Sequence, residues 1–224
     1  MSTPKVIVFD VNETLSDMTP MQKRFTEIGV PGWTAKVWFA SLLRDGFALA
    51  ATGNSGRFAE IGESILRSML AGEPLKLDID SAVNHIMHGF LELQTHSDVP
   101  EGIRLLASAD IRLITLSNGS TQVAERLFAT AGIREYFEQV LSVEDAGAWK
   151  PAAAAYKYAA GTCSVDLGDM MLVAVHPWDI DGAKRAGLHA AWVNRHNQSY
   201  PAHFLAPDHT VTTLPGLAEM VLDS

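Results

Sequence analysis

The first pattern in the chain is a continuous apolar run, residues 6–9, that ends at a carboxylate, Asp10. Largely apolar segments follow at residues 111–116, 170–175 and 190–193, and residues 138–141 form a further short candidate strand. Apolar residues that follow one another without alternating with polar ones are typical of strands buried on both faces. The pattern therefore predicts five strands of a parallel sheet.

Between these runs the apolar residues recur with the spacing of α-helices. Gly132 is placed to end one of these helices, and Pro151 stands where a helix start tolerates proline. The expected helices lie at residues 103–107, 122–131, 152–160, 182–186 and 214–222. Strands that alternate with helices form a parallel, doubly wound sheet covered on both faces, so the predicted fold is α/β with a Rossmann-like core.

Residues 16–98 interrupt this alternation, because one helical pattern follows another there with no strand between them. The four helices are expected at residues 18–28, from Thr34 onward, at 58–70 and at 82–93. Their position directly after the first strand favours a helical cap domain inserted into a core of residues 1–15 and 99–224. The alternative is that the four helices extend the core.

The composition narrows the class of protein and of partner. A net charge of −9 over 224 residues, with no run of Lys or Arg, argues against a nucleic-acid or anionic-membrane partner. Cys163 is the only cysteine, which excludes an internal disulfide framework and a cysteine metal cluster. The first residues lack the features of a signal peptide, and no apolar run reaches the ~20 residues of a membrane span. We therefore expect a soluble, cytoplasmic protein that acts on a small molecule.

Polar side chains stand where the predicted strands end. A single polar strand end is uninformative, but a parallel sheet brings the carboxyl ends of its strands to one edge, where ligands bind. Several sets that include a lysine and acidic groups predict a functional site at that edge. The sets are Asp10, Asn12, Glu13 and Thr14; Ser117 and Asn118; Lys150; and His176 with Asp179.

Four motifs in this order resemble the haloacid dehalogenase superfamily of hydrolases, whose members use an aspartate nucleophile. The motifs are Phe9-Asp10-x-x-x-Thr14-Leu15, Leu116-Ser117-Asn118-Gly119, Lys150-Pro151 and the segment from Asp179 to Gly187. The resemblance implies that Asp10 is the nucleophile and that Lys150 supplies positive charge beside it. It also implies that Thr14, Ser117 and Asn118 hold the nucleophile or the substrate. Asp179 then orients groups at the last of these strand ends.

Two departures argue against the Mg²⁺-dependent phosphatases of this superfamily. Those enzymes carry a second aspartate two residues after the nucleophile, where this chain has Asn12, whose amide cannot transfer protons at neutral pH. They also carry a metal-ligand aspartate at the position of Val175, whose side chain offers no oxygen to Mg²⁺. The chain instead resembles the type II haloacid dehalogenases, which use no metal, so we expect no cofactor. Tyr156 and Trp178 fit this branch as residues beside the substrate.

This branch implies a reaction in two steps. Asp10 displaces halide from carbon 2 of a short 2-haloacid and forms an ester on the enzyme. Water then attacks the ester carbonyl carbon and releases a 2-hydroxy acid. Because halide leaves without a proton donor, Asn12 is tolerated after the nucleophile and is expected to contact the substrate.

The second step needs a base, and two more departures supply a candidate. His176 stands where the branch has asparagine, and Glu13 stands where glycine is usual. We expect Glu13 to orient the imidazole and His176 to take the proton from water, because histidine is suited to proton transfer at neutral pH. The alternative is that Glu13 pairs with a lysine and that His176 caps the next helix.

A further departure concerns the carboxylate of the substrate. The branch binds it with an arginine that follows a tryptophan in the cap, whereas here Trp38 is followed by Phe39. A buried carboxylate needs a cation or aligned N–H groups to replace its hydration. The candidates are Arg44, Arg57 and the amides beside Ser117 and Asn118. Phe39 is expected to form part of the wall of the substrate pocket.

Two other functions stay open at this point. One is a Mg²⁺-dependent phosphatase of the same superfamily, and the other is a non-catalytic binding protein that retains the fold. Asp10 and Lys150 together argue against the second, since a pure binder has no use for a paired nucleophile and lysine. His85 and His88 have the spacing of a metal pair, but no further ligand completes it, so no metal site is expected. The resemblance also implies a homodimer through the cap.

Overall fold

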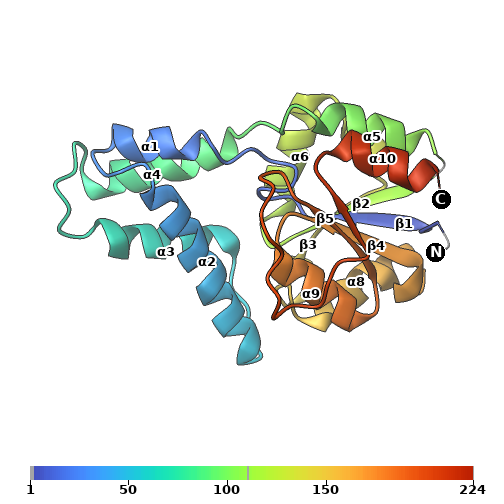
Figure 1. Ribbon diagram of the computed structural model, residues 1–224. Helices are drawn as coiled ribbons and strands as arrows, with labels where there is room; N and C mark the ends of the chain where they lie inside the picture. Colours follow the sequence, from blue (N-terminus) through green and yellow to red (C-terminus); the bar gives the residue numbers. More distant parts are fainter. Residues whose placement is uncertain (1–2, 110, 224) are drawn as a thin grey trace.

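The computed structural model describes residues 3–109 and 111–223, and its centre is a six-stranded parallel sheet in the order β3-β2-β1-β4-β5-β6 (Figure 1). The strands are β1 (Val6–Phe9), β2 (Arg112–Ser117), β3 (Gln139–Ser142), β4 (Met170–Ala174), β5 (His189–Val193) and β6 (His209–Val211). The doubly wound α/β fold and the five expected strands are confirmed. The sixth strand, β6, was not predicted, because this short, partly exposed edge strand contains no apolar run.

The middle of the sheet is β1, which is hydrogen-bonded to β2 on one side and to β4 on the other. Val6 and Val8 pack on one face and Ile7 and Phe9 on the opposite face, and all four are fully buried. Helices cover both faces, as a parallel sheet requires. One face carries α5 (Val99–Ala107), α6 (Thr121–Ala131) and α10 (Leu214–Leu222), and the other carries α8 (Ala153–Cys163) and α9 (Pro177–Ala186) (Figure 1).

Four helices follow β1 before the next strand begins: α1 (Met21–Glu27), α2 (Thr34–Ala51), α3 (Phe58–Leu70) and α4 (Ile79–Leu91). They pack on one another around Trp38, whose ring contacts Phe25 and Phe90 and whose Nε1 donates a hydrogen bond to the carbonyl of Gly62. Figure 1 shows this group of helices beside the sheet, on the side to which the carboxyl ends of the strands point. The helices therefore stand next to the edge where the polar strand ends meet.

Two neighbouring segments connect the four helices to the sheet. Ser16, on the outgoing segment, forms an isolated antiparallel bridge with Thr95 on the returning segment. Beside this bridge, the N–H of Asp17 donates a 2.8 Å hydrogen bond to the carbonyl of Gln94. The chain thus leaves the sheet and returns to it through a hydrogen-bonded pair of segments.

Several elements differ from their expected bounds. Helix α9 begins at Pro177, earlier than the expected residue 182, because its first turn carries proline. Helix α8 begins only at Ala153, and Pro151 follows a cis peptide bond outside it, so the expectation that this proline opens the helix was wrong. Thr34 lies inside α2 and does not cap it. The remaining short elements are α7 (Val143–Ala146) and two 3-10 helices (Arg134–Tyr136 and Leu167–Asp169).

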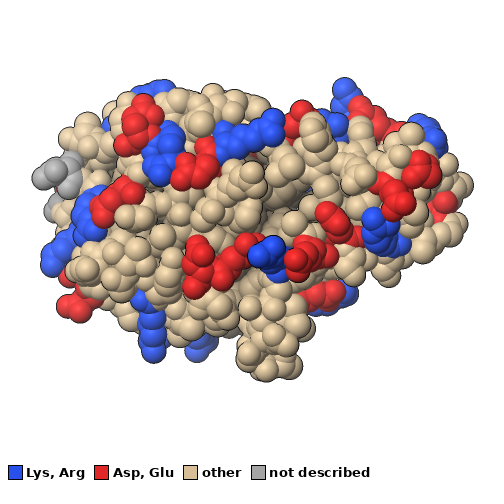
Figure 2. Space-filling view, turned by 180° about the vertical axis from the view of Figure 1, so that it is seen from behind, with Lys and Arg blue, Asp and Glu red and all other residues tan. Residues whose placement is uncertain are grey.

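Charged side chains of both signs are mixed on the surface. On the face in Figure 2, Lys and Arg residues lie among Asp and Glu residues, and no large patch of one sign is visible there. In the part of the chain that the structure describes, no helix combines the length and the hydropathy of a membrane span. Cys163 is a free, buried thiol. The face of the molecule in Figure 2 therefore offers no extended basic surface to a polyanion.

Candidate active site

Asp10 follows the last residue of β1, and its N–H donates to the carbonyl of Val173 on β4, which fixes it at the edge of the sheet. Its Oδ2 accepts a 2.6 Å hydrogen bond from Thr14 Oγ1, which in turn accepts one from the N–H of Val175. Its Oδ1 accepts a 2.9 Å hydrogen bond from Lys150 Nζ. Both carboxylate oxygens therefore have a partner, and the side chain is almost fully buried.

Lys150 joins this carboxylate to a second one. Its Nζ lies 2.9 Å from Asp10 Oδ1 and 2.6 Å from Asp179 Oδ2, and both Lys150 and Asp179 are fully buried. The hydroxyl of Tyr156 donates a 2.5 Å hydrogen bond to Asp179 Oδ1. A buried charge is tolerated when it is paired and hydrogen-bonded, and it is costly when a partner is lost. The four side chains therefore form one network that depends on each of its members.

The network sets the protonation of its members. Burial opposes ionisation of Asp10, but the charges of Lys150 and His176 and the hydrogen bonds that it accepts outweigh burial and hold the pKa of Asp10 below its usual value. Burial opposes the charge of Lys150 as well, yet the two carboxylates raise the pKa of its ammonium group above the usual value. Burial and the charge of Asp179 raise the pKa of Tyr156 well above the value of a free phenol. Asp10 is therefore ionised at neutral pH, as a carboxylate nucleophile must be.

Ser117 and Asn118, at the end of β2, hold neighbouring backbone. Asn118 Nδ2 donates to the carbonyl of Lys150 at 3.2 Å, and Asn118 Oδ1 accepts from the N–H of Lys150 at 3.0 Å. Ser117 Oγ accepts a 2.9 Å hydrogen bond from the N–H of Gly119. Asn118 thus fixes the chain that carries the lysine, while the expected contact of the pair with substrate stays a prediction.

His176 and Glu13 are brought together beside Asp10. His176 Nε2 lies 3.8 Å from Asp10 Oδ2 and 3.6 Å from Glu13 Oε2. The same nitrogen lies 3.2 Å from the carbonyl oxygen of Asn12, and because a carbonyl only accepts, Nε2 carries a proton in this geometry. One nitrogen therefore faces both carboxylates, so Glu13 does not hold the ring from the side opposite Asp10. The proton-transfer role of the pair stays a prediction.

The alternative interpretation of these two residues does not match their contacts. His176 directly precedes α9, but its side chain makes no capping hydrogen bond there. Within the described residues, the ionic partner of the Glu13 carboxylate is His176, not a lysine.

The backbone of Glu13 has a φ of +64°, in the left-handed region. A residue with a Cβ in this region costs about 1 kcal/mol relative to the right-handed conformation, whereas glycine has no such cost. This explains why glycine suits the position. In this chain the position carries a carboxylate instead, and that carboxylate faces His176.

Aromatic rings surround the imidazole. Trp178 stacks on His176 with ring centroids 5.1 Å apart, and Phe39 of α2 lies 6.3 Å from the same ring. Phe47, also on α2, contacts Trp178 edge-on at 4.9 Å. Phe39, which stands where the resembled branch has arginine, therefore adds an apolar ring and no charge next to His176. This side of the site is an aromatic wall built from the sheet edge and from α2.

The two arginines that the sequence offered for a substrate carboxylate are exposed. The Nε of Arg44 pairs with Asp45 at 2.8 Å, and its side chain is 69% exposed. The guanidinium of Arg57 lies 4.0 Å from Glu60, with 73% of the side chain exposed. The structure therefore brings neither arginine to Asp10.

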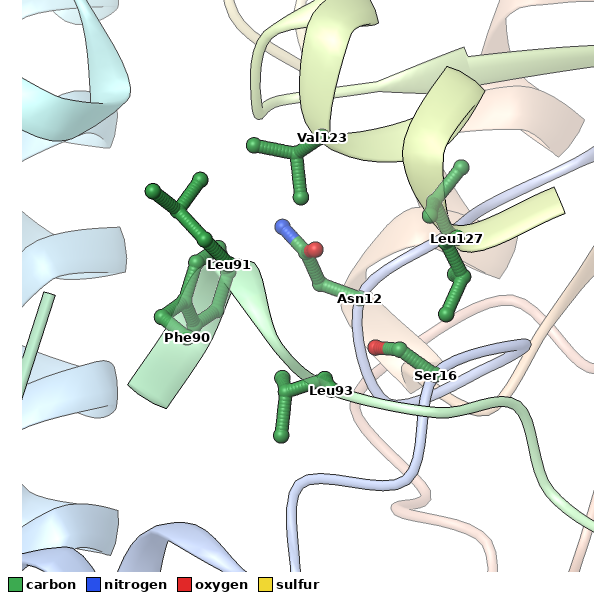
Figure 3. A pocket seen from close by; sticks show the side chains of 8 residues that line it. Asn12, Ser16, Phe90, Leu91, Leu93, Val123 and Leu127 are labelled. Carbon is green, nitrogen blue, oxygen red and sulfur yellow. The ribbon is translucent and has the colours of Figure 1, made fainter. Parts of the chain in front are cut away.

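A small pocket opens beside the loop that follows the nucleophile, between α4 and α6. Figure 3 shows the amide of Asn12 pointing into it, among apolar side chains from both helices. Asn12 and Ser16 are its polar lining residues, and the others are Val11, Phe90, Leu91, Leu93, Val123 and Leu127. Asn12 thus presents an amide to a small, largely apolar pocket, and its expected contact with the substrate stays a prediction.

The donor set does not fit the divalent cation of the superfamily's phosphatases. Lys150 Nζ already takes one oxygen of Asp10 and one of Asp179. The neighbouring strand end carries Val175, whose side chain has no oxygen. Among the residues that the structure describes, no group of three or more His, Cys, Asp or Glu side chains is placed to hold a metal ion.

Two further residues contact the framework of the site, although the sequence analysis did not single them out. Trp149 Nε1 donates a 2.9 Å hydrogen bond to the carbonyl of Gly56, which ties the chain before Lys150 to the four helices. Arg195 donates a 2.9 Å hydrogen bond to the carbonyl of Thr14. The position of Trp149 next to the Lys150-Pro151 motif was a usable signal, whereas Arg195 follows β5 and carries none.

Comparison with known proteins places this geometry in a family. The model of a family described as haloacid dehalogenase-like hydrolase matches residues 4–187. The (S)-2-haloacid dehalogenase of Pseudomonas sp. (strain YL) is 28% identical over 220 residues, which cover 96% of this chain and 94% of that protein. A crystal structure of an L-2-haloacid dehalogenase superposes with a TM-score of 0.91 at 25% identity, covering 98% of this chain and 99% of the other.

A third similar protein, less similar in sequence, has the same fold. It is the L-2-haloacid dehalogenase from Xanthobacter autotrophicus with chloropropionic acid covalently bound, with a TM-score of 0.85, 22% identity and coverage of 97% of this chain and 98% of that one. The family match covers most of the chain, and the order of the four motifs agrees with it. The chain therefore belongs to the haloacid dehalogenase-like hydrolase family, where its similarities lie with the type II, L-2-haloacid dehalogenase branch.

Proposed function

We propose that this hydrolase removes halide from a short 2-haloacid through an ester intermediate on Asp10. The observation that carries the proposal is the Asp10 carboxylate itself, held ionised at the sheet edge by Lys150 at 2.9 Å and Thr14 at 2.6 Å. Asn12 follows in place of the acid that a phosphatase needs. The (S)-2-haloacid dehalogenase activity named for the Pseudomonas relative supports the same reaction.

In the first step a carboxylate oxygen of Asp10 attacks carbon 2 of the substrate. A carbon–oxygen bond forms, the carbon–halogen bond breaks, and halide departs with the electron pair. The positive charge of Lys150 and the hydrogen bond from Thr14 position the nucleophile without protonating it. No proton is transferred in this step, so the neutral amide of Asn12 is compatible with it.

In the second step water attacks the ester carbon of the Asp10 side chain. His176 acts here in the tautomer that carries its ring proton on Nδ1, so Nε2 is free to take a proton from this water and to return it to the departing oxygen of the 2-hydroxy acid. Asp10 then loses its remaining proton to solvent, so each turnover releases one halide and one proton. In that tautomer Nε2 no longer donates to the carbonyl of Asn12, 3.2 Å away, and the nearby Glu13 carboxylate stabilises the cationic ring that forms.

The substrate carboxylate has no arginine partner in this proposal. Lys150 is already engaged by two carboxylates, and Arg44 is exposed beside Asp45. We infer that N–H groups beside Ser117 and Asn118 bind the carboxylate, and that Phe39, Tyr156 and Trp178 border the rest of the substrate with Asn12. Uncharged N–H groups bind a carboxylate more weakly than an arginine does. We therefore expect the enzyme to act on small substrates that are present at high concentration.

The organisation and location of the protein are part of the proposal. Residues 16–98 act as a cap domain over a core of residues 1–15 and 99–224, and the paired segments at Ser16 and Thr95 are its connections. The free thiol of Cys163 suits the cytoplasm. Assembly as a homodimer through the cap is a prediction from the resemblance, and sedimentation of the purified protein tests it.

The test is halide release from 2-chloropropionate and from chloro- and fluoroacetate, with and without EDTA. Release that is unaffected by EDTA and absent in Asp10→Asn supports the proposal. EDTA-sensitive cleavage of a generic phosphate ester indicates a phosphatase instead. Inertness in both assays indicates a binding protein.

A further inference from the structure

The strained position of Glu13 depends on contacts from outside its own loop. Its backbone is left-handed, where glycine is favoured, so neighbouring groups must hold it there. Its N–H donates to Ser16 Oγ at 3.2 Å, which is a contact within the loop. Its carbonyl contacts a residue distant in sequence, His96, whose Nε2 lies 2.9 Å away. Since the carbonyl only accepts, His96 Nε2 is the donor in this hydrogen bond.

His96 lies at the point where the chain returns from the four helices. Its N–H donates a 3.0 Å hydrogen bond to the carbonyl of Leu15, and the residue before it, Thr95, forms the bridge with Ser16. One histidine therefore holds the loop after the nucleophile at two carbonyls, those of Glu13 and Leu15. The carbonyl between them, that of Thr14, is held by Arg195.

We propose that His96 is a positioning residue for water activation: it holds Glu13 in its left-handed conformation and so directs the Glu13 carboxylate to His176. The inference rests on the proposed function, because it assigns His96 a part in the second step only. Asp10 has its own partners, Thr14 and Lys150, so ester formation does not depend on His96.

The charged groups around the two histidines are few. His176 Nε2 faces the carboxylates of Asp10 and Glu13, and the aromatic neighbours of its ring are Trp178, which stacks on it, and Phe39. The charges near His96 are those of Asp17 and Arg195: although partial burial opposes the ionisation of Asp17, the hydrogen bonds from Thr19 and the charges of His96 and Arg195 lower the pKa of this carboxyl. Replacing His96 by a neutral residue therefore leaves the charges that face His176 unchanged.

The test compares four variants by rapid-quench halide release and steady-state turnover across pH. In His96→Leu we expect the initial burst of one halide per site to be preserved and kcat to fall on the order of ten-fold, as part of the ~10²–10⁴-fold that a positioned base supplies. The pH profile of kcat should be displaced as in Glu13→Gln. His96→Gln, which keeps an N–H at the same distance along the side chain, should restore the value of kcat and its pH profile. His88→Leu, at an exposed histidine of α4, should leave both unchanged.

Two further variants, Glu13→Gly and the double variant Glu13→Gly/His96→Leu, show whether His96 acts through Glu13. In a Glu13→Gly background the carboxylate is gone and the left-handed backbone needs no support, so adding His96→Leu should change kcat less than about two-fold. An equal loss in both backgrounds, or a lost halide burst, would overturn the positioning role. If Glu13→Gln is impaired and His96→Leu turns over normally, the proposal for His96 fails alone. If Glu13→Gln itself turns over normally, the proposed role of the Glu13–His176 pair fails with it.

Discussion

Glu13 Oε2 lies 3.6 Å from His176 Nε2, the nitrogen that also lies 3.8 Å from Asp10 Oδ2. A carboxylate that bound the far nitrogen would fix the tautomer of the ring and leave the near nitrogen free for water. Here the carboxylate approaches the reactive side, so its contribution is electrostatic. In the proposed second step, this carboxylate stabilises the cationic ring that forms when water gives up its proton.

This arrangement predicts that His176→Asn separates the two chemical steps. Ester formation needs only Asp10, Lys150 and Thr14, so a burst of one halide per site is expected at the normal rate. Turnover after the burst should fall about 10²–10⁴-fold, because the base is missing. Intact-mass spectrometry of the quenched variant should show the ester accumulating on the chain. Normal steady-state turnover in this variant would remove His176 from the mechanism.

Lys150→Met is expected to reduce the free energy of unfolding by about 3–5 kcal/mol at neutral pH, because it leaves two buried carboxylates without their cation. Urea unfolding followed by circular dichroism measures this. Lys5→Met is the matched control, since Lys5 pairs with Asp169 on the surface and its loss should leave the free energy of unfolding close to that of the wild type. Equal effects of the two substitutions would contradict the network.

The pH dependence of stability follows from the same network. The pKa of Lys150 is raised in the folded state. Its contribution to the free energy of unfolding is therefore complete below the pKa of the unfolded state and is lost as pH rises through the pKa of the folded state. The pKa of Asp10 is lowered in the folded state. Its contribution to the free energy of unfolding is therefore present above the pKa of the unfolded state and is lost as pH falls through the pKa of the folded state. In the wild type, the contribution of Lys150 and Asp10 to the free energy of unfolding should therefore stay constant between about pH 5 and pH 9. Lys150→Met should become more stable as pH falls toward 5, because protonation relieves its unpaired carboxylates.

Tyr156→Phe is expected to cost about 1.5–3 kcal/mol of unfolding free energy, the contribution of a hydrogen bond to a charged group. The substitution keeps the ring and removes the donor to Asp179 Oδ1. Tyr158→Phe, on the same helix but half-buried, is the control and should stay within about 0.5 kcal/mol of the wild type. A negligible effect of Tyr156→Phe would show that Asp179 finds another donor.

Phe39→Arg tests how the chain manages without the arginine of its branch. A guanidinium at this position on α2 offers a charge-assisted hydrogen bond to a substrate carboxylate, so the KM for 2-chloropropionate should fall about ten-fold. Phe39→Leu removes the ring without adding charge and should not lower KM. A higher KM in Phe39→Arg would indicate that the aromatic contact with His176 matters more for substrate than the missing charge.

The residues of the site that could be predicted from the sequence are those marked by a neighbouring strand or by a short motif. Asp10 ends a buried strand, Lys150 precedes a proline in a motif, and Asp179 follows another strand, so a parallel sheet had to bring them to one edge. The structure places them within hydrogen-bond distance through Lys150. The fold was equally accessible, because its strands and helices alternate in a regular way.

The parts of the site that could not be predicted from the sequence depend on the direction of a side chain around its helix and on contacts between residues far apart in the sequence. Arg44 lies five residues after Phe39, about 140° around the helix, so it points away from the side that Phe39 presents to His176. His96 meets Glu13 only because the chain comes back beside its own starting point after four helices. No local spacing encodes that contact.

The ester mechanism requires that the oxygen added to the product comes from Asp10. A single turnover of 2-chloropropionate in oxygen-18 water, with enzyme in excess over substrate, tests this directly by mass spectrometry of the product and of the peptide that contains Asp10. We expect an unlabelled 2-hydroxy acid and a heavier Asp10 peptide, because water attacks the side-chain carbonyl carbon. A labelled product with an unlabelled peptide would show that water displaces halide directly and would contradict the ester mechanism.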